Sequence, residues 1–222
     1  MTIDGACLCF KAGNAVILRG GKESLNSAKC LAGIFHKALA ENGIDEDAVQ
    51  LVTETSHDLV GMLLQRSDCI DLVIPRSGER LIRAVVEQSK IPVIKHFNGI
   101  CHVYVDKSAD IDKAVNILIN AKTQRTGVCN AMECVIIDRH IDDANGKKLL
   151  DCLADRGVEL FGNKDAQSHD SRIKDIGDDS NYHHEYLALK ASVKFVDNVA
   201  EACDHIEKNS SRHTEAVVAE DA

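Results

Sequence analysis

Apolar positions in the first part of the chain fall alternately into short runs and into longer stretches with helical spacing. The short runs have the length of buried strands, and the longer stretches place apolar side chains on one face of a helix. Strands that alternate with helices predict a parallel sheet covered on both faces. We therefore expect an α/β, Rossmann-like architecture up to about Phe97. The predicted strands are residues 15–18, 49–53, 70–74 and 92–94, and the predicted helices are residues 24–42, 57–65 and 79–89.

A second α/β unit is predicted after Asn98 and Gly99, where the alternation of strands and helices begins again. Residues 163–181 form a polar stretch that we predict to be a surface loop with some local order. The pattern divides the chain into a first domain, residues 1–98, and a second domain, residues 99–222. The predicted strands of the second domain are residues 101–106, 134–138, 158–161, 192–196 and 216–219, and its predicted helices are residues 145–156, residues 199–208 and one that begins at Ile111.

The composition narrows the classes of function. A chain of 222 residues, 45% of them hydrophobic, is long enough to bury one core or two small ones. Its formal net charge of −9 argues against binding to nucleic acid or to an anionic membrane surface, because both repel an acidic chain. No stretch approaches the roughly 20 apolar residues of a membrane helix, and Asp4 interrupts any signal-peptide pattern. These features predict a cytoplasmic protein that acts on a small molecule.

The nine cysteines are predicted to be reduced thiols. They are odd in number and lack CxxC spacing, which argues against a disulfide framework and against a zinc site. The ten histidines show no metal-ligand spacing either, so no metal site is expected. Cys7 and Cys9 form a close pair, which we interpret as two small buried side chains on one side of a strand.

Cys129 differs from the other cysteines because it lies in a polar, cationic connection between a predicted helix and a predicted strand. Positive charge on Lys122 and Arg125 would lower the pKa of a nearby thiol, so Cys129 is the candidate nucleophile. The same two cations are candidates for holding anionic groups of a substrate, or are solvated charges at the end of a helix. Asn130 either polarises a developing oxyanion or caps the loop.

Two strand-to-helix turns are candidates for binding phosphate or ribose, because backbone amides at the start of a helix attract negative charge. The first turn contains Gly20 and Gly21, and the second contains Ser77 and Gly78. Neither follows the GxGxxG pattern, so dinucleotide binding would differ from the standard mode. The alternatives are a tight connection for the first turn and a helix cap for the second, with Arg76 as a solvated charge.

Residues 120–130, NAKTQRTGVCN, resemble the nucleophile segment of the gamma-glutamyl phosphate reductase family, a branch of the aldehyde dehydrogenase superfamily. The resemblance implies an α/β, aldehyde dehydrogenase-like fold: part of an NADP-binding Rossmann-like domain in residues 1–98, then part of an α/β catalytic domain in residues 99–222. Regions that the family carries before and after these segments are not found, so we expect an internal fragment. Further segments that resemble the family, in the same order, are residues 12–23, 70–78, 99–106 and 185–187.

The resemblance also implies a set of cofactor contacts. Arg19 and Glu23 fall where the superfamily contacts the adenosine ribose, and Lys22 favours a 2′-phosphate, which implies NADP(H) as the cofactor. Asn98 and Gly99 fall beside the nicotinamide. The full set of residues with an implied cofactor role is Arg19, Gly20, Gly21, Lys22, Glu23, Arg76, Ser77, Gly78, Asn98, Gly99 and Glu185.

The implied reaction is a reduction of L-glutamyl 5-phosphate by NADPH through a thioester on Cys129, in proline biosynthesis. Glu185 falls where superfamily members bind the nicotinamide ribose, and His213 is expected near the substrate. Hydrolytic aldehyde dehydrogenases carry a glutamate just before their glycine pair. This chain has no carboxylate in residues 95–99, which favours phosphate-linked reduction over irreversible aldehyde oxidation.

Several alternatives stay open at this point. An aldehyde dehydrogenase of broader substrate range is the enzymatic alternative, and a catalytically inactive remnant of the family is another. A thiol or metal protein of unrelated fold is disfavoured by the cysteine and histidine spacings. The resemblance implies glutamate 5-kinase as the pathway partner and is compatible with a homo-oligomer.

Overall fold

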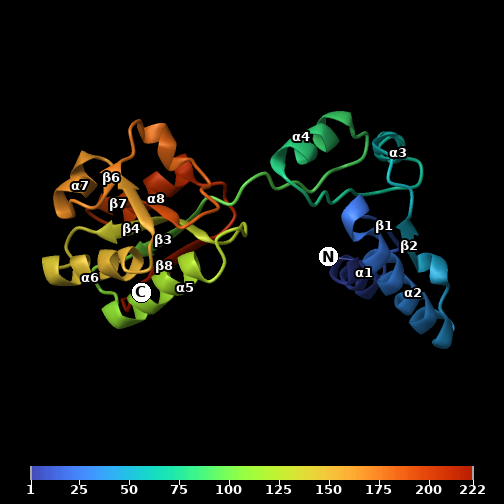
Figure 1. Ribbon diagram of the computed structural model, residues 1–222, viewed down its shortest axis with the longest axis horizontal. Helices are drawn as coiled ribbons and strands as arrows, with labels where there is room; N and C mark the ends of the chain where they lie inside the picture. The colour runs from blue at the N-terminus through green and yellow to red at the C-terminus, as the bar shows by residue number, and fades with distance from the viewer. Residues whose placement is uncertain (1, 222) are drawn as a thin grey trace. The chain divides into compact units, whose positions relative to one another are not determined.

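The computed structural model describes residues 2–221 and divides into two compact units (Figure 1). The first unit comprises the chain up to Pro75 together with Ala84–Ile94, and the second comprises Arg76–Arg83 and the chain from Lys95 onward. Each unit contains a parallel sheet and helices. No helix within residues 2–221 is long and apolar enough to cross a membrane.

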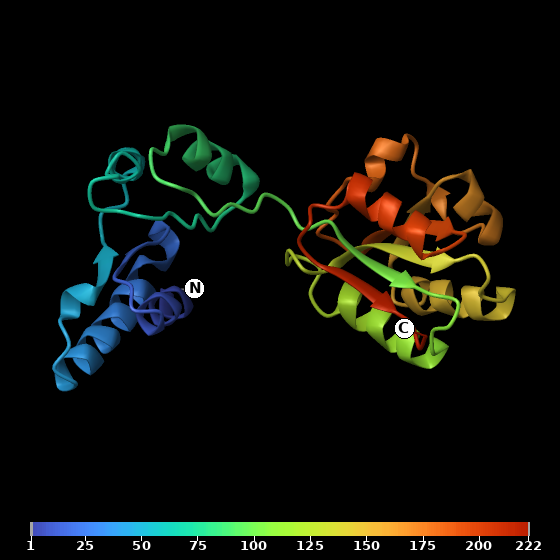
Figure 2. The ribbon, with the colours of Figure 1, turned by 180° about the vertical axis from the view of Figure 1, so that it is seen from behind.

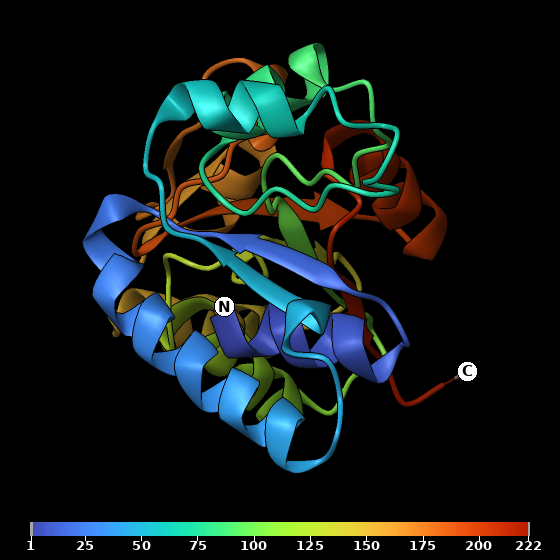
Figure 3. The same ribbon diagram turned by 90° about the vertical axis from the view of Figure 1, so that its right-hand side faces the viewer.

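The first unit is built on two parallel strands. Strand β1 (Val16–Arg19) pairs in register with β2 (Val49–Val52). Helices α1 (Thr2–Lys11) and α2 (Leu25–Glu41) both pack on this pair of strands, as Figure 3 shows in blue. The predicted strands at residues 15–18 and 49–53, and the predicted helix at residues 24–42, are confirmed to within two residues. The small core that the helices and strands share contains Ala6, Leu39 and Val49.

Two interpretations of the first unit were wrong. Residues 70–74 and 92–94 do not form strands but meet in a single parallel bridge between Val73 and Val93. Pro92 has no N–H group to donate, which limits the ladder at this point. Cys7 and Cys9 lie in α1 rather than in a strand, and Cys7 is exposed. Residues two apart point to different sides of a helix, so these cysteines do not share a face.

Two further helices follow β2 along the chain. Helix α3 spans His57–Leu63 and α4 spans Glu79–Gln88. Both were predicted from their helical spacing, and both begin at the predicted residue. Helix α3 begins after Ser56, whose hydroxyl oxygen accepts the Asp58 N–H, as an N-cap residue does.

The second unit contains a parallel sheet of six strands in the order β6-β5-β7-β4-β3-β8. The central strand β4 is buried at every position, as the middle of a sheet covered on both faces requires. The order follows from crossover connections through helices rather than from hairpins. The strands are β3 (Cys101–Val105), β4 (Met132–Asp138), β5 (Glu159–Gly162), β6 (Lys174–Asp175), β7 (Lys190–Val196) and β8 (Glu215–Val218).

Helices cover both faces of this sheet. Helices α5 (Ile111–Thr123) and α6 (Asp143–Ala154) lie along one face, and α8 (Val199–Asn209) lies along the other (Figures 1 and 2). Each begins at a side-chain cap, because the oxygen of Asp110, Asp142 or Asn198 accepts a backbone N–H three residues on. These caps explain why the three helices begin where they do.

Residues 163–181 are more regular than the predicted surface loop with some local order. This stretch contains α7 (Lys164–His169), β6 and a 3₁₀ turn, η3 (Asp179–Tyr182). Its order depends on contacts with distant residues, which a polar local pattern does not reveal. The buried Tyr182 hydroxyl, for example, donates to the Val193 carbonyl oxygen in β7.

Candidate active site

The candidate nucleophile lies at the amino edge of the six-stranded sheet. Cys129 is on the connection from α5 to β4, just before β4 begins at Met132. Strands β4, β3 and β8 are neighbours and run parallel, so the segments that precede them meet at the same edge. Gly99 precedes β3 and His213 precedes β8. The topology therefore brings together three of the residues predicted for the site.

Gly99 packs directly against the backbone of Cys129. A Cβ atom built on Gly99 would lie 1.7 Å from the Cys129 carbonyl oxygen, so only glycine fits at this position. The Gly99 N–H donates to Oε1 of Glu185, at 2.8 Å. The next amide, of Ile100, donates to the Ser211 hydroxyl oxygen at 2.8 Å. These contacts fix the segment before β3 against both the cysteine loop and the segment before β8.

We expect Gly99→Ala to lower the free energy of unfolding by about 1–3 kcal/mol, because the added methyl group must displace the Cys129 backbone. The rate at which iodoacetamide alkylates Cys129 should change as well. Urea denaturation and peptide mapping by mass spectrometry measure the two effects. Gly146→Ala in α6 is the matched control, because no atom lies within 4 Å of its added Cβ. Equal behaviour of the two variants would contradict the proposed packing.

Two imidazole rings lie beside the Cys129 thiol. The Cys129 Sγ atom and a ring nitrogen from each of His96 and His213 all lie within 4.8 Å of one another. The two ring centroids are 4.4 Å apart. Burial lowers the pKa of His96, and the nearby charges of His213 and Arg76 lower it further. His96 is therefore suited to accept a proton as a neutral imidazole.

A second thiol, that of Cys101, contacts the backbone of the loop that carries Cys129. Cys101, the first residue of β3, is buried, and its Sγ atom donates to the Cys129 carbonyl oxygen at 3.1 Å. Burial raises the pKa of the Cys101 thiol to about 11, with the charge of Glu215 adding to this effect. Cys101 thus remains a thiol at neutral pH, whereas Cys129 is the partly accessible member of the pair.

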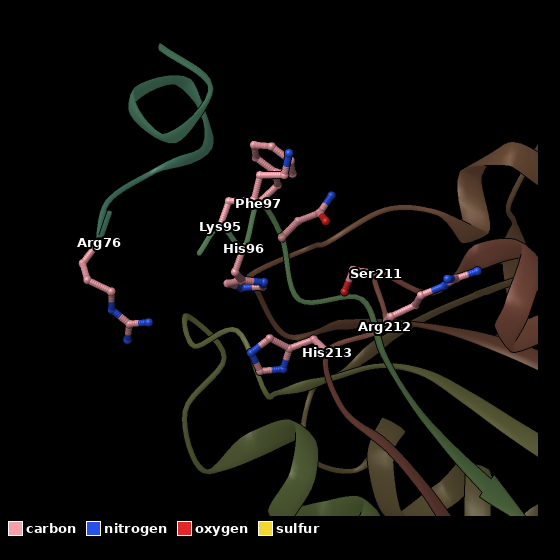
Figure 4. Close-up of a pocket in the computed structure, with 8 residues that line it drawn as sticks. Arg76, Lys95, His96, Phe97, Ser211, Arg212 and His213 are labelled. Carbon is pink, nitrogen blue, oxygen red and sulfur yellow. The ribbon is translucent and has the colours of Figure 1, made fainter. Parts of the chain in front are cut away.

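A cavity opens in front of the imidazole pair (Figure 4). The rings of His96 and His213 lie next to each other in it, and the Arg76 side chain extends across from them. Arg76 and Lys95 make the lining cationic, which favours an anionic ligand such as a phosphate or a carboxylate. The lining residues are Arg76, Lys95, His96, Phe97, Asn98, Ser211, Arg212 and His213.

The structure revises the interpretation of Lys122. Its side chain is fully buried, and Nζ donates to Oε2 of Glu133 at 2.8 Å. Burial lowers the pKa of Lys122 and raises that of Glu133. Lys122 is therefore neither a solvated charge nor a direct ligand of the substrate, because its ammonium group is buried and paired with Glu133. Arg125 and Asn130 are exposed on the Cys129 loop, and their roles remain predictions.

Glu133 links this buried pair to the segment that carries Glu185. Its second oxygen, Oε1, accepts the N–H of Leu187 at 3.3 Å. Leu187 has a φ of 52°, which a non-glycine residue rarely adopts, so the surrounding contacts impose this turn. The Lys122–Glu133 pair therefore helps to place Glu185 beside Gly99.

The first predicted cofactor turn has the expected local structure. Arg19 ends β1, Gly20 and Gly21 follow, and a 3₁₀ turn (Lys22–Ser24) leads into α2. Arg19 Nη2 donates to the Thr55 carbonyl oxygen at 2.9 Å, whereas its buried Nε has no hydrogen-bond partner among the described residues. A Cβ atom built on Gly21 would lie 2.1 Å from Glu23 Oε1, so the Glu23 carboxylate lies in front of the backbone at this glycine. A ribose hydroxyl could donate to this carboxylate, whereas a phosphate would require it to move.

The second predicted turn belongs to the other unit. Arg76, Ser77 and Gly78 precede α4, and all three are exposed. A Cβ atom on Gly78 would meet open space, so none of the described residues requires glycine at this position.

Sequence patterns missed several residues of the site. Glu133 is a charge within the apolar run of β4, and that position is itself a signal of a buried pair. His96 lies in residues 95–99, where the sequence analysis considered only the absence of a carboxylate. No local signal exists for Cys101 or Ser211, because their importance comes from the register of β3 with its neighbours.

The sequence matches the aldehyde dehydrogenase family over residues 1–165. It is 45% identical to the gamma-glutamyl phosphate reductase of Idiomarina loihiensis over 220 residues, which is 99% of this chain and 52% of the relative. The chain thus spans about half the length of the curated relatives it matches.

Two solved structures are similar to this fold. The crystal structure of gamma-glutamyl phosphate reductase from Thermotoga maritima has a TM-score of 0.89 and 36% identity, and the match covers 99% of this chain and 53% of that one. An acetylating aldehyde dehydrogenase from Geobacillus thermoglucosidasius has a TM-score of 0.72 at 18% identity, covering 99% of this chain and 57% of that one. The second likeness shows the fold alone.

Proposed function

Since the chain belongs to the aldehyde dehydrogenase family, we propose that it carries the nucleophile and part of the cofactor site of a gamma-glutamyl phosphate reductase. Such an enzyme reduces L-glutamyl 5-phosphate to L-glutamate 5-semialdehyde and releases phosphate. The observation that carries the proposal is the placement of the Cys129 thiol within 4.8 Å of two imidazoles, on a loop that packs against Gly99.

The first chemical step forms a thioester. His96 accepts the proton of the Cys129 thiol, and the thiolate attacks the acyl carbon of the substrate. The bond between that carbon and the phosphate oxygen breaks, and phosphate leaves. Arg76 and Lys95 line the cavity beside the imidazoles and offset the negative charge of the departing group. The Cys129 N–H and the Asn130 side chain are the candidate donors to the oxyanion.

The second step transfers a hydride, which NADPH supplies when it is bound. The carbon–sulfur bond breaks, so that the semialdehyde forms and the Cys129 thiolate returns. Glu185 holds Gly99 in place through Oε1, and its Oε2 atom is the candidate acceptor for a hydroxyl of the nicotinamide ribose. Asn98 and Gly99 are the candidate residues that would lie beside the nicotinamide.

The residues of the first unit suit the other end of the cofactor. The Arg19 guanidinium and the backbone N–H groups at the start of the turn are the candidate donors to ribose and phosphate oxygens. The Glu23 carboxylate lies over Gly21 and would have to move aside for an anionic group. Lys22 is exposed and is the candidate partner of a 2′-phosphate, which favours NADP over NAD. Glu23 is the candidate acceptor for a ribose hydroxyl.

A reductase is favoured over a hydrolytic aldehyde dehydrogenase of broader range. An acyl phosphate carries its own leaving group, so no residue has to activate water for release of the acyl group. Residues 95–98 supply no carboxylate for that purpose. The proposal places the protein in proline biosynthesis in the cytoplasm, with glutamate 5-kinase as the source of the acyl phosphate, and allows a homo-oligomer.

The test is the reaction in reverse. Purified protein is mixed with glutamate 5-semialdehyde, inorganic phosphate and NADP or NAD, and the absorbance of the reduced nicotinamide is followed. We expect turnover that requires phosphate, with a higher kcat/KM for NADP than for NAD. Turnover that does not depend on phosphate would instead support the hydrolytic alternative. A folded protein that binds NADP without turnover would support an inactive member of the family.

A further inference from the structure

A second group of metal-ligating side chains lies in the second unit, between one face of the sheet and α8. None of its members lines the cavity beside the imidazole pair. His102 in β3 and Cys134 in β4 are register partners on neighbouring strands. His205 approaches them from α8, which covers this face of the sheet. One ligand atom from each residue lies within 4.8 Å of the other two, and Cys134 Sγ is 3.8 Å from His205 Nε2.

His102 has a nitrogen atom without a partner. The side chain of His102 is fully buried, and its Nδ1 atom lies 3.0 Å from Oε2 of Glu215. If Nδ1 carries the hydrogen and donates to this carboxylate, Nε2 presents a lone pair. That Nε2 atom is buried and has no hydrogen-bond partner among the residues the structure describes. Buried polar atoms are nearly always satisfied, so this atom indicates a missing partner.

The donor set identifies the kind of partner. A carboxylate that holds one nitrogen of a histidine while the other faces a cluster of ligands is the usual arrangement around a bound metal ion. Two imidazoles and one thiolate suit Zn²⁺, which prefers nitrogen and sulfur ligands in tetrahedral geometry. Zn²⁺ together with the Cys134 thiolate and the Glu215 carboxylate has no net charge, as a buried site requires. A water molecule would satisfy Nε2 but would not explain the converging thiol and second imidazole.

We propose that His102, Cys134 and His205 bind a Zn²⁺ ion, with Glu215 as the carboxylate that orients His102. On binding, the Cys134 sulfur loses its proton to solvent as the zinc–sulfur bond forms. His205 is half-buried, whereas His102 and Cys134 are buried. The Nδ1 atom of His205 lies 3.3 Å from the Asn209 amide nitrogen, which is a donor. Binding of Zn²⁺ through Nε2 therefore requires the ring hydrogen to move to Nδ1 and the Asn209 amide to turn so that its oxygen accepts it. The ion ties β3, β4 and α8 together, and through Glu215 also β8.

The experiment uses Co²⁺ as a spectroscopic substitute for Zn²⁺. The candidate active site also offers two imidazoles and one thiol, from His96, His213 and Cys129. The measurements are therefore made in a Cys129→Ser background. Metal-free, reduced protein is titrated with Co²⁺ alone and then with Zn²⁺. We expect one Co²⁺ per chain, a thiolate charge-transfer band, and displacement of the band by Zn²⁺. We also expect Zn²⁺ to raise the melting temperature.

Three variants assign the site. Cys134→Ser should abolish the charge-transfer band, His205→Ala should abolish the Zn²⁺-dependent rise in melting temperature, and Glu215→Gln should weaken Zn²⁺ affinity by about 10- to 100-fold. Cys203→Ser is the matched control, because Cys203 is an exposed cysteine of the same helix as His205. His205→Ala keeps the test decisive if Cys134→Ser does not fold.

The proposal is overturned if the Cys129→Ser protein binds neither Co²⁺ nor Zn²⁺. It is also overturned if the band survives in the Cys134→Ser variant, or if metal binding is present in the unmodified chain and absent from the Cys129→Ser protein. The last result would assign the metal to the cluster beside the nucleophile.

Discussion

Cys129→Ala is expected to lower kcat of the phosphate-dependent reaction by at least about 10³-fold, because the covalent route has no other nucleophile. Cys101 is the nearest alternative, since its Sγ atom contacts the Cys129 carbonyl oxygen. It cannot take over the role, because burial raises its pKa to about 11 and leaves it protonated at neutral pH. Steady-state turnover with saturating semialdehyde and phosphate measures the loss.

The acyl-enzyme gives a second readout that does not depend on complete turnover. Incubation with an acyl phosphate should add the acyl mass to the peptide that contains Cys129, and the variant should lack this adduct. Peptide mapping is necessary because Cys7, Cys30, Cys69 and Cys203 are exposed thiols as well. Cys203→Ala is the control and should retain both adduct and rate. An equal loss in the control would rule out Cys129 as the specific nucleophile.

The fold of the second unit followed from the sequence wherever local pattern and tertiary contacts agree. The strand that begins at Cys101 and the helix that begins at Ile111 start at the predicted residues, because apolar periodicity and the Asp110 cap act locally. The regular elements within residues 163–181 were not predicted, because the order of that polar stretch comes from distant contacts such as that of Tyr182 with β7. Similarly, residues 70–74 have the composition of a strand but gain only one bridge.

In the candidate site, too, features that depend on local sequence were predicted, and features that depend on distant contacts were not. The sequence singled out Cys129, Gly99, Glu185 and His213, and the structure brings their segments to one edge of the sheet, while their roles in catalysis remain predictions. The two clusters of histidine and cysteine could not be predicted from the sequence, because a search for metal ligands by spacing assumes that the ligands are close in sequence. In a parallel sheet, register partners such as His102 and Cys134 come together from separate strands.

The burial of Lys122 could not be predicted from the sequence either, and the second prediction with a large expected effect concerns this residue. Lys122→Met is expected to lower the free energy of unfolding by about 3–5 kcal/mol, because it leaves the Glu133 carboxylate buried without its partner. The double variant Lys122→Met with Glu133→Leu should recover part of this loss, since two apolar side chains can replace a buried ion pair. Urea denaturation followed by circular dichroism measures both.

The pH dependence of the Lys122→Met variant separates this explanation from loss of packing. Burial already raises the pKa of Glu133, and removing the ammonium group takes away the interaction that lowers it. The folded variant therefore binds a proton at pH values at which the unfolded chain does not, and its stability falls as pH rises through that range. The deficit relative to the unmodified protein should thus be smaller at acidic pH. A deficit that is the same at all pH values would indicate a packing defect instead.

Lys113→Met supplies the matched comparison on the same helix. Lys113 pairs with Glu220, but both side chains are about half exposed, so its replacement should cost no more than about 1 kcal/mol. A similar small loss for Lys122→Met would contradict the buried pair. Because Glu133 also accepts the Leu187 N–H, the same variant should release the segment that carries Glu185. Turnover of Lys122→Met should then fall even under conditions in which the protein remains folded, whereas Lys113→Met should keep its rate.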